Sequence, residues 1–440
     1  MTRLVLLVPT FPKLSETFIV HKFLGLRARG WDVHVVCGRS PAEAWAHFPE
    51  LARQPDARRR VHVTWPHRPR WLAALLWPAA LLRCALRQPR GCRRYLAHGR
   101  RRLGGRILAR LYLDAELIIL QPEIVHVAFG ALAPERMELK ELLGCRLSVS
   151  FRGYDLNRVG LEERDYYREV WAQADGLHLL GEGLWRRAQE RGCPPDAPHA
   201  LIPPAIDTAV FSPPPGTPAD SPAVSVQPPL LWPVSDRASQ AARPETGHCG
   251  NERLPPAEAR PLRILSVGRL TWEKGYEYAL QAVRLLQDQG VACEYRIVGA
   301  GDYLEALAFA RHELGLAAHV HFLGALAPAE VRAQMGWADA LLHTAVAEGF
   351  GNVVLEAQAM QLAVVCSDAG GLPENVVDGE TGFVVPRRDA QAAAARLAQL
   401  AGDPALRRRL GQAGRARVQA HFRLEEQTAA LARFFENVLK

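Results

Sequence analysis

The chain has 440 residues, of which 48% are hydrophobic and 23% charged, enough for two globular domains with separate cores and unlike a fibrous or disordered protein. The net charge is +8, and arginine supplies most of the positive charge because only five lysines occur. The eight cysteines lack zinc-ligand spacing and no apolar run is long enough to cross a bilayer, so we expect free thiols and a cytoplasmic location.

The first part of the chain predicts alternating strands and helices. Residues 3–8 form an apolar run of strand length, and a helix capped near Ser15 and Glu16 follows before a strand over 32–37. Later strands are expected over 124–128, 146–151, 176–180 and 200–202. This alternation predicts a Rossmann-like domain with a parallel sheet over residues 1–211.

Residues 52–112 are rich in arginine, interleaved with leucines and with Trp65, Trp71 and Trp77. Two interpretations stay open. The helices could pack on the sheet and simply expose their arginines, or they could present a basic, tryptophan-bearing face to an anionic membrane. The second would place the protein peripherally on the inner face of the plasma membrane. No nucleic-acid-binding signature is present, so no nucleic-acid partner is expected.

The remaining sequence divides into three parts. Residues 212–261 are rich in proline, alanine and serine without periodicity, which predicts a flexible linker or insertion. Residues 262–420 predict a second Rossmann-like domain, and residues 421–440 a helix that packs back on the first domain. The strands of the second domain are expected over 262–267, 294–298, 320–323, 340–343 and 363–367.

The stretch GRLTWEKGYE follows the first strand of the second domain. It places Gly268, Arg269 and Lys274 in a strand-to-helix loop, and two cations beside a helix start suit a diphosphate. A solvated loop with incidental charges is the alternative. Gly299 and Leu323 end the next two strands, where a glycine permits close approach of a ligand to the backbone.

The stretch AEGFGNVVLEA carries two carboxylates, Glu348 in a glycine-rich loop and Glu356 on a helix. Read alone, they could be an acid/base pair. The helix starts near Asn352, so the backbone amides around it form an anion site that faces the same place as the two cations. Carboxylates near a diphosphate then make sense as acceptors from hydroxyl groups, with Glu348 on a sugar and Glu356 on a ribose.

Together, GR…EKG, EGFGNVVLEA and GGLPENVVDGETGFVVP resemble the retaining glycosyltransferases of family 4, and they cover most of residues 262–390. The start, FPKLSETFIVHKFLGLRARG, is similar to the subgroup that builds bacterial exopolysaccharides such as colanic acid. The resemblance implies an α/β protein of GT-B fold, with two Rossmann-like doubly wound parallel-sheet domains facing across a cleft. It implies no metal and no cofactor, and three catalytic residues, Arg269, Lys274 and Glu348. The implied donor site comprises Gly268, Arg269, Lys274, Gly299, Leu323, Glu348, Phe350, Gly351, Asn352, Val353 and Glu356.

The N-terminal half departs from this family in two motifs. Ala128 stands where the subgroup often has a second histidine after His126, and Arg152 stands where it often has a histidine before Asp155. For His126 and Asp155 a structural role is at least as well supported as a catalytic one. Arg152 could bind an anionic acceptor. The acceptor-side candidates are Ser15, Glu16, His126, Arg152 and Asp155.

The resemblance predicts a hexosyltransferase that uses a UDP- or GDP-linked sugar and a glycan or lipid-linked acceptor. Two alternatives from other classes stay open. One is a sugar-nucleotide epimerase or phosphorylase of the same fold. The other is a donor-binding subunit without catalytic activity, which the missing histidines would explain.

Overall fold

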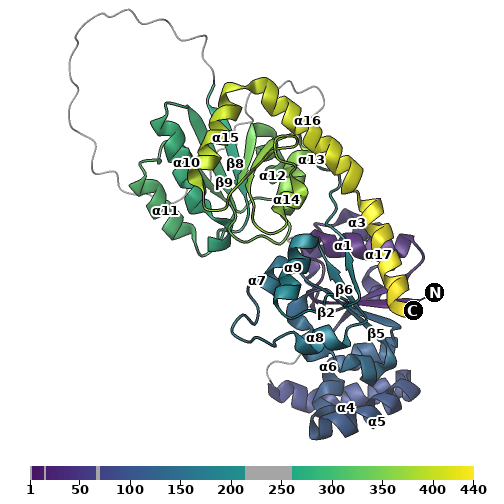
Figure 1. Ribbon diagram of the computed structural model, residues 1–440. Coiled ribbons are helices and arrows are strands. Elements are labelled where there is room, and N and C mark those ends of the chain that lie inside the picture. The colour runs from purple at the N-terminus through teal and green to yellow at the C-terminus, as the bar shows by residue number, and fades with distance from the viewer. Residues whose placement is uncertain (1, 14–15, 66–69, 214–259) are drawn as a thin grey trace, which may run out of the picture.

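The computed structural model describes residues 2–13, 16–65, 70–213 and 260–440. Within these ranges the chain forms two units, each built around a parallel sheet with helices on both faces (Figure 1). No helix in the described part of the chain is long and apolar enough to span a bilayer. Most of the predicted linker over 212–261 lies outside the described residues, as does Ser15.

Seven parallel strands form the N-terminal sheet in the order β3-β2-β1-β4-β5-β6-β7. The order reverses between β1 and β4, which makes this pair the switch point of a doubly wound sheet. The sequence missed only β3, a three-residue edge strand too short to show a pattern. The strands are β1 (Arg3–Thr10), β2 (Asp32–Arg39), β3 (Val61–Val63), β4 (Ile124–Val127), β5 (Arg146–Ser150), β6 (Gly176–Leu179) and β7 (His199–Leu201).

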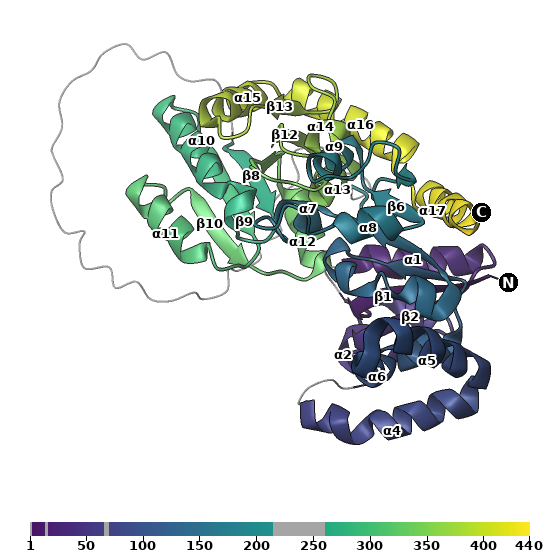
Figure 2. The same ribbon diagram turned by 60° about the horizontal axis from the view of Figure 1, so that its bottom comes forward.

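The helices of this unit fall into two groups. One group surrounds the sheet: α1 (Thr17–Ala28), α2 (Ala42–Trp45), α3 (Pro49–Ala52), α7 (Gly153–Asn157), α8 (Arg168–Gln173) and α9 (Glu182–Glu190). The other group packs together at the end of the unit remote from the C-terminal sheet (Figures 1 and 2). It consists of α4 (Arg70–Arg87), α5 (Pro89–Leu103) and α6 (Ile107–Leu120).

Six parallel strands form the C-terminal sheet in the order β10-β9-β8-β11-β12-β13, with the switch point between β8 and β11. Five of them were expected from the sequence, and β13 was not. The strands are β8 (Leu262–Val267), β9 (Cys293–Val298), β10 (Val320–Gly324), β11 (Ala340–His343), β12 (Ala363–Ser367) and β13 (Phe383–Val385). The helices are α10 (Tyr276–Asp288), α11 (Leu304–Glu313), α12 (Pro328–Trp337), α13 (Asn352–Ala359), α14 (Leu372–Asn375), α15 (Ala390–Gly402) and α16 (Pro404–His421).

The last helix, α17 (Leu424–Leu439), leaves the C-terminal unit and packs on the N-terminal one (Figure 1). Its Phe435 is fully buried, with its ring centroid 6.0 Å from that of Trp31 on the N-terminal unit. Thr428 fits against Gly25 of α1, where an added Cβ would lie 2.6 Å from the threonine hydroxyl. Side chains of α17 therefore form part of the core of the N-terminal unit.

Candidate active site

The loops after β8 and β11 meet at the switch point of the C-terminal sheet. Because β8 and β11 are hydrogen-bonded neighbours, their carboxyl ends lie side by side. Lys274 ends the loop after β8, and its Nζ lies 2.5 Å from Oε2 of Glu348 in the loop after β11. The structure thus brings together two residues that the sequence separates by more than seventy positions.

Glu348 is an ionised carboxylate held by three donors. Its Oε2 also accepts from Nε2 of His343 at 2.9 Å, and its Oε1 accepts from the amide of Gly349 at 2.9 Å. Burial alone would raise the pKa of this carboxyl, but Lys274 and His343 outweigh it and hold the pKa well below its usual range. The sequence interpretation missed His343, although its position at the carboxyl end of β11 was a usable signal.

Glycines let the backbone close around this point. Gly268 donates its amide to the carbonyl of Val298, and an added Cβ on Gly299 would lie 1.8 Å from the carbonyl oxygen of Gly268. Gly351 adopts φ +89°, a left-handed conformation that permits the chain to turn into α13. Leu323 lies partly buried near the end of β10, the strand beyond β9.

The N-terminus of α13 and the side chain of Arg269 carry N–H groups that no described residue engages. Arg269 is exposed, and its guanidinium makes no hydrogen bond or ion pair with the described residues. The amides of Asn352 and Val353 likewise have no acceptor among the described residues. A guanidinium and helix-terminal amides are each groups that suit an anion.

Glu356 lies one turn into α13 in a different environment from Glu348. No hydrogen bond or ion pair to its carboxyl occurs within the described chain. Burial raises its pKa to about 7. Phe350, between the two glutamates, is buried and packs 6.2 Å from the ring of Phe422, so only its backbone can face a ligand.

The N-terminal unit contributes Arg152, which lies close to the Glu348 loop. An added Cβ on the next residue, Gly153, would lie 2.6 Å from the Cα of Gly349. The guanidinium carbon of Arg152 stacks 3.5 Å from the ring centroid of Phe18, while its Nε is buried without a hydrogen bond. Burial lowers the pKa of this guanidinium to about 10.

Glu16, like Arg152, has a buried polar atom without a hydrogen-bond partner among the described residues. Its Oε1 pairs with Lys13 at 2.5 Å, and its Oε2 is buried without a partner. The side chain does not cap α1, contrary to the expectation from the sequence. It is free to accept from another group instead.

The polar groups of His126 and Asp155 are engaged in hydrogen bonds within the N-terminal unit. His126 is completely buried, bonded to Lys22 at 3.0 Å and to Ser148 and Ser150 at 2.9 Å, and it offers no surface to an acceptor. Asp155 accepts from the amides of Arg152 at 2.8 Å and of Ala131 at 2.9 Å, which holds the start of α7. We therefore leave both out of the candidate site. Their surroundings come from distant strands and could not be read from the local motif.

Glu374 links the two units in a way that the sequence did not indicate. Its carboxylate accepts from the amides of Glu182 and Gly183 at 3.0 and 2.8 Å, at the start of α9 on the N-terminal unit. A second link is the ion pair of Arg158 with Glu273 at 2.7 Å. These contacts hold the loop after β8 and the segment after β12 against the N-terminal unit.

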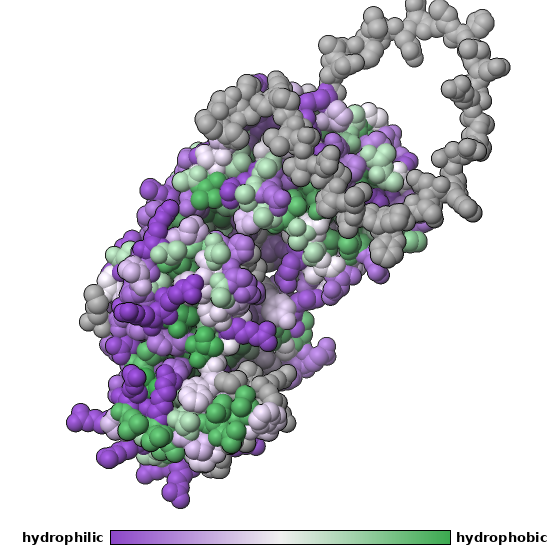
Figure 3. Space-filling model, turned by 180° about the vertical axis from the view of Figure 1, so that it is seen from behind, coloured by the Kyte–Doolittle hydropathy of each residue, from purple (hydrophilic) through white to green (hydrophobic). Residues whose placement is uncertain are grey.

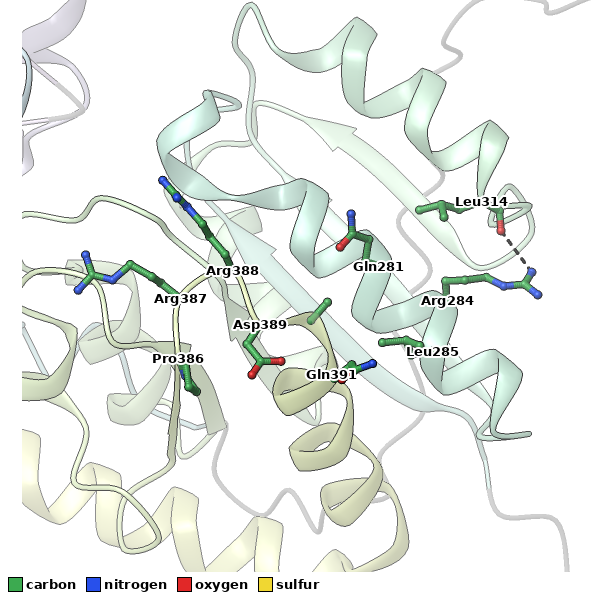
Figure 4. Close-up of a pocket in the computed structure, with 10 residues that line it drawn as sticks. Gln281, Arg284, Leu285, Leu314, Pro386, Arg387, Arg388, Asp389 and Gln391 are labelled. Atoms are coloured by element: carbon green, nitrogen blue, oxygen red, sulfur yellow. Dashed lines mark hydrogen bonds between the residues drawn. The ribbon is translucent and has the colours of Figure 1, made fainter.

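A groove of about 690 Å³ lies elsewhere, between α10 and the segment that leads into α15 (Figure 4). Arg284, Arg387 and Arg388 line it. Arg284 already bonds the carbonyl of Leu314 at 3.3 Å and Arg387 pairs with Asp368 at 2.9 Å. None of its lining residues belongs to the predicted site, so we assign it no part in the chemistry.

Comparison with known proteins places these features in context. The family model for glycosyl transferases group 1 matches residues 253–417. AmsK of Erwinia amylovora, an amylovoran biosynthesis glycosyltransferase, is 31% identical over 72% of this chain and 70% of its own. WcaL of Salmonella typhimurium, assigned to colanic acid biosynthesis as a glycosyltransferase, is 26% identical over 88% of each chain. Anabaena HepE, solved with UDP and glucose, matches with a TM-score of 0.65 at 15% identity over 99% of this chain and 100% of its own, which shows the shared GT-B fold.

Proposed function

This chain belongs to the group 1 glycosyltransferases, and on that basis we propose that it transfers a hexose from a nucleoside-diphosphate sugar to a glycan or lipid-linked acceptor, with retention and without a metal ion. The observation that carries the proposal is the contact of Lys274 with Glu348, which joins the loop after β8, where Arg269 lies, to the loop that leads into α13. The role of AmsK in amylovoran biosynthesis and the UDP and glucose in HepE support a polysaccharide product and a nucleotide-sugar donor.

The donor diphosphate would lie between the two cations and the start of α13. Lys274 uses one of its three N–H groups on Glu348, which leaves two for phosphate oxygens. Arg269 is unengaged and can offer a pair of parallel N–H groups. These charges stabilise the leaving diphosphate in the place where a metal ion would otherwise act.

The two carboxylates would hold the rest of the donor. Two donors already occupy Oε2 of Glu348, but Oε1 receives only the amide of Gly349 and can accept from one sugar hydroxyl. Both oxygens of Glu356 are unpartnered, and they can accept from the two neighbouring hydroxyls of a ribose. The structure therefore favours hydroxyl binding over an acid/base pair.

Transfer needs no protein base in this arrangement. The acceptor oxygen bonds to the anomeric carbon on the face from which the diphosphate leaves, and the bond between that carbon and the phosphate oxygen breaks. The acceptor proton passes to the departing diphosphate oxygen, so charge and atoms balance. Retention follows because entry and departure share one face of the sugar.

The acceptor would approach from the N-terminal unit, where Arg152 and Glu16 lie. The buried Nε of Arg152 lacks a partner, and an unpaired buried donor costs roughly 1–3 kcal/mol. An anionic group on the acceptor, such as a phosphate or a uronic acid, would satisfy it. Oε2 of Glu16 would accept from an acceptor hydroxyl.

The proposed compartment is the cytoplasm, a reducing environment in which thiols stay unpaired. The seven cysteines in the described ranges are all unpaired. A lipid-linked acceptor would bring the enzyme to the inner face of the plasma membrane.

The experiment that tests the proposal incubates the purified chain with UDP-, GDP- and ADP-sugars, chosen first by thermal shift, and with lipid-linked glycan acceptors. We expect release of nucleoside diphosphate that depends on the acceptor, and a product whose anomeric configuration, seen by NMR, equals that of the donor. Arg269→Ala and Lys274→Ala should each lower kcat/KM at least about tenfold, as loss of a charge-assisted contact implies. Arg408→Ala, an exposed arginine on α16, is the matched control.

Three outcomes would contradict the proposal. Conversion of the donor without any acceptor would favour an epimerase. Use of inorganic phosphate as acceptor would favour a phosphorylase. Donor binding without turnover across the acceptor panel would favour a silent binding subunit.

A further inference from the structure

One helix of the N-terminal unit exposes an unbroken apolar face. Along α4, the side chains of Trp71, Leu75, Leu82 and Leu86 are 67%, 68%, 60% and 74% exposed, and Pro78 between them is exposed as well. These five positions, which we call the α4 ridge, follow the spacing of a single stripe on a helix. The ridge is about 22 Å long, at 1.5 Å per residue.

The opposite side of α4 is already occupied. Ala80 and Cys84 are fully buried, and Trp77 packs partly buried against the core. Arg83, the single charged residue between the ends of the ridge, is paired with Glu116 of α6. The helix is thus apolar on both sides, and only one side has a partner among the residues that the structure describes, whereas surface helices normally place polar residues there.

The structure also sorts the tryptophans of this region. Trp65 is partly buried, with its ring 5.7 Å from that of Tyr112, and Trp77 lies against the same core. Only Trp71 of the three is exposed. Of the two interpretations left open for this region, packing on the core describes Trp65 and Trp77, whereas Trp71 remains on the surface.

The neighbouring helix α5, which packs against α4, is rich in arginine. Arg90, Arg93, Arg100 and Arg101 are exposed there, whereas the guanidinium of Arg94 lies against Gly144. No aspartate or glutamate occurs from residue 57 to residue 113, a stretch that holds fifteen arginines. In Figure 3 the lower end of the molecule, where α4 and α5 lie in Figure 1, shows hydrophobic side chains next to projecting hydrophilic ones.

We propose that the α4 ridge inserts into the surface of an anionic phospholipid bilayer, with the α5 arginines bound to lipid headgroups. An apolar ridge next to an arginine-rich helix lies in the interface and does not span the bilayer, in agreement with the absence of a spanning helix from the described chain. Anionic headgroups complement a stretch of chain that holds fifteen arginines and no acidic residue. The proposal does not depend on the sugar chemistry.

Two other occupants fit the ridge less well. A second copy of the chain, joined by a two-fold axis, would bring the same arginine-rich stretches close together without acidic partners on either side. Nucleic acid would pair with the arginines but would leave the ridge without an apolar partner. A bilayer satisfies both the apolar and the basic parts of the surface.

The test measures co-flotation of the full chain with vesicles of phosphatidylethanolamine and phosphatidylglycerol, and with vesicles of phosphatidylcholine alone. We expect binding to the anionic vesicles, and Leu75→Ser with Leu82→Ser should lower the partition coefficient at least about tenfold. Phe309→Ser on α11, which replaces a side chain that is 66% exposed, should leave binding unchanged. Leu86→Ser is a second variant in case the double substitution impairs folding.

The arginines are tested separately. Arg93→Gln with Arg101→Gln should weaken binding to anionic vesicles and reduce its dependence on salt, whereas Arg408→Gln with Arg409→Gln on α16 should not. Unchanged flotation of the Leu75/Leu82 variant overturns the proposal. The proposal is also overturned if the Leu75/Leu82 variant loses a dimer in light scattering while its vesicle binding is unchanged. Binding of the chain to duplex DNA but not to vesicles would overturn it as well. The thermal shift with nucleotide sugar should stay the same in every variant, which separates this inference from the proposed function.

Discussion

Glu348 and Glu356 lie in one short stretch, but their pKa values shift in opposite directions because their neighbours differ. Glu348 faces Lys274 and His343, which hold its pKa well below the usual range. Glu356 is buried, no described residue supplies a cation or hydrogen-bond donor to it, and its pKa rises to about 7. Only eight positions separate the two glutamates in the sequence. Their pKa values differ because the side chains around each glutamate come from different elements of the fold.

At the residue scale, Glu356→Gln should stabilise the ligand-free protein while it weakens donor binding. The pKa of Glu356 is raised from 4.5 to about 7, so between these pH values the folded state holds a proton that the unfolded chain has released. The free energy of unfolding therefore falls as pH rises through this window, and the ionised carboxylate costs stability above about pH 7. The substitution should gain on the order of 1–3 kcal/mol above about pH 7 and nothing below about pH 4.5.

Urea unfolding as a function of pH measures the gain, and titration with nucleotide sugar measures the loss of affinity. In the wild type the affinity should fall as pH drops below about 7, because the ribose hydroxyls need the ionised form. Glu305→Gln on α11, an exposed site, is the control. A variant that binds donor as tightly as the wild type would remove Glu356 from the ribose site.

At the element scale, the N-terminus of α9 is capped by a residue of the other unit. Helix starts usually receive a cap from their own chain neighbourhood, yet here the carboxylate of Glu374 accepts from the first amides of the helix. The N-cap residue of α9 itself is Gly181, which has no side chain to accept from these amides. The cap therefore couples the stability of α9 to contact between the two units.

Glu374→Ala should cost about 0.5–2 kcal/mol in the free energy of unfolding, the usual effect of a lost cap. It should also loosen the contact between the units, because the amides of Glu182 and Gly183 lose their acceptor. Small-angle scattering would then show a larger radius of gyration than in the wild type. Glu380→Ala, at an exposed turn nearby, should change neither quantity; equal stability in the two variants would mean that the cap contributes nothing.

At the scale of the whole molecule, the chain crosses twice between its units. It passes from the N-terminal sheet to the C-terminal one and returns through α16 and α17. The aromatic rings of α17 fill the N-terminal core, where Phe435 lies 5.0 Å from His126. The last sixteen-residue helix is therefore part of the fold of a unit that begins more than four hundred residues earlier.

Phe435→Ala should destabilise the N-terminal unit by about 3–5 kcal/mol, the cost of a large cavity in a closed core. Hydrogen exchange would show the loss of protection in β4 and α1, which α17 covers. Phe309→Ala on α11 is the matched control, because that ring is 66% exposed. Loss of protection confined to α17 itself would contradict this role.

Sequence by itself determined the alternation of strands and helices and the chemistry of the motifs. Strand length and apolar pattern are local, so β8, β11 and β12 could be placed at their bounds. The chemistry of Arg269 and Lys274 is likewise a property of residue type and of position after a strand.

Only the tertiary structure decided which of these groups are free and which are engaged. His126 is buried among Lys22 and two serines, and Asp155 accepts hydrogen bonds at the start of a helix. Two tryptophans pack against the core, and Glu374 contacts the other unit. The α4 ridge is exposed. The physical reason is that burial, pKa and hydrogen-bond satisfaction are set by contacts between segments far apart in the chain, and no local pattern records them.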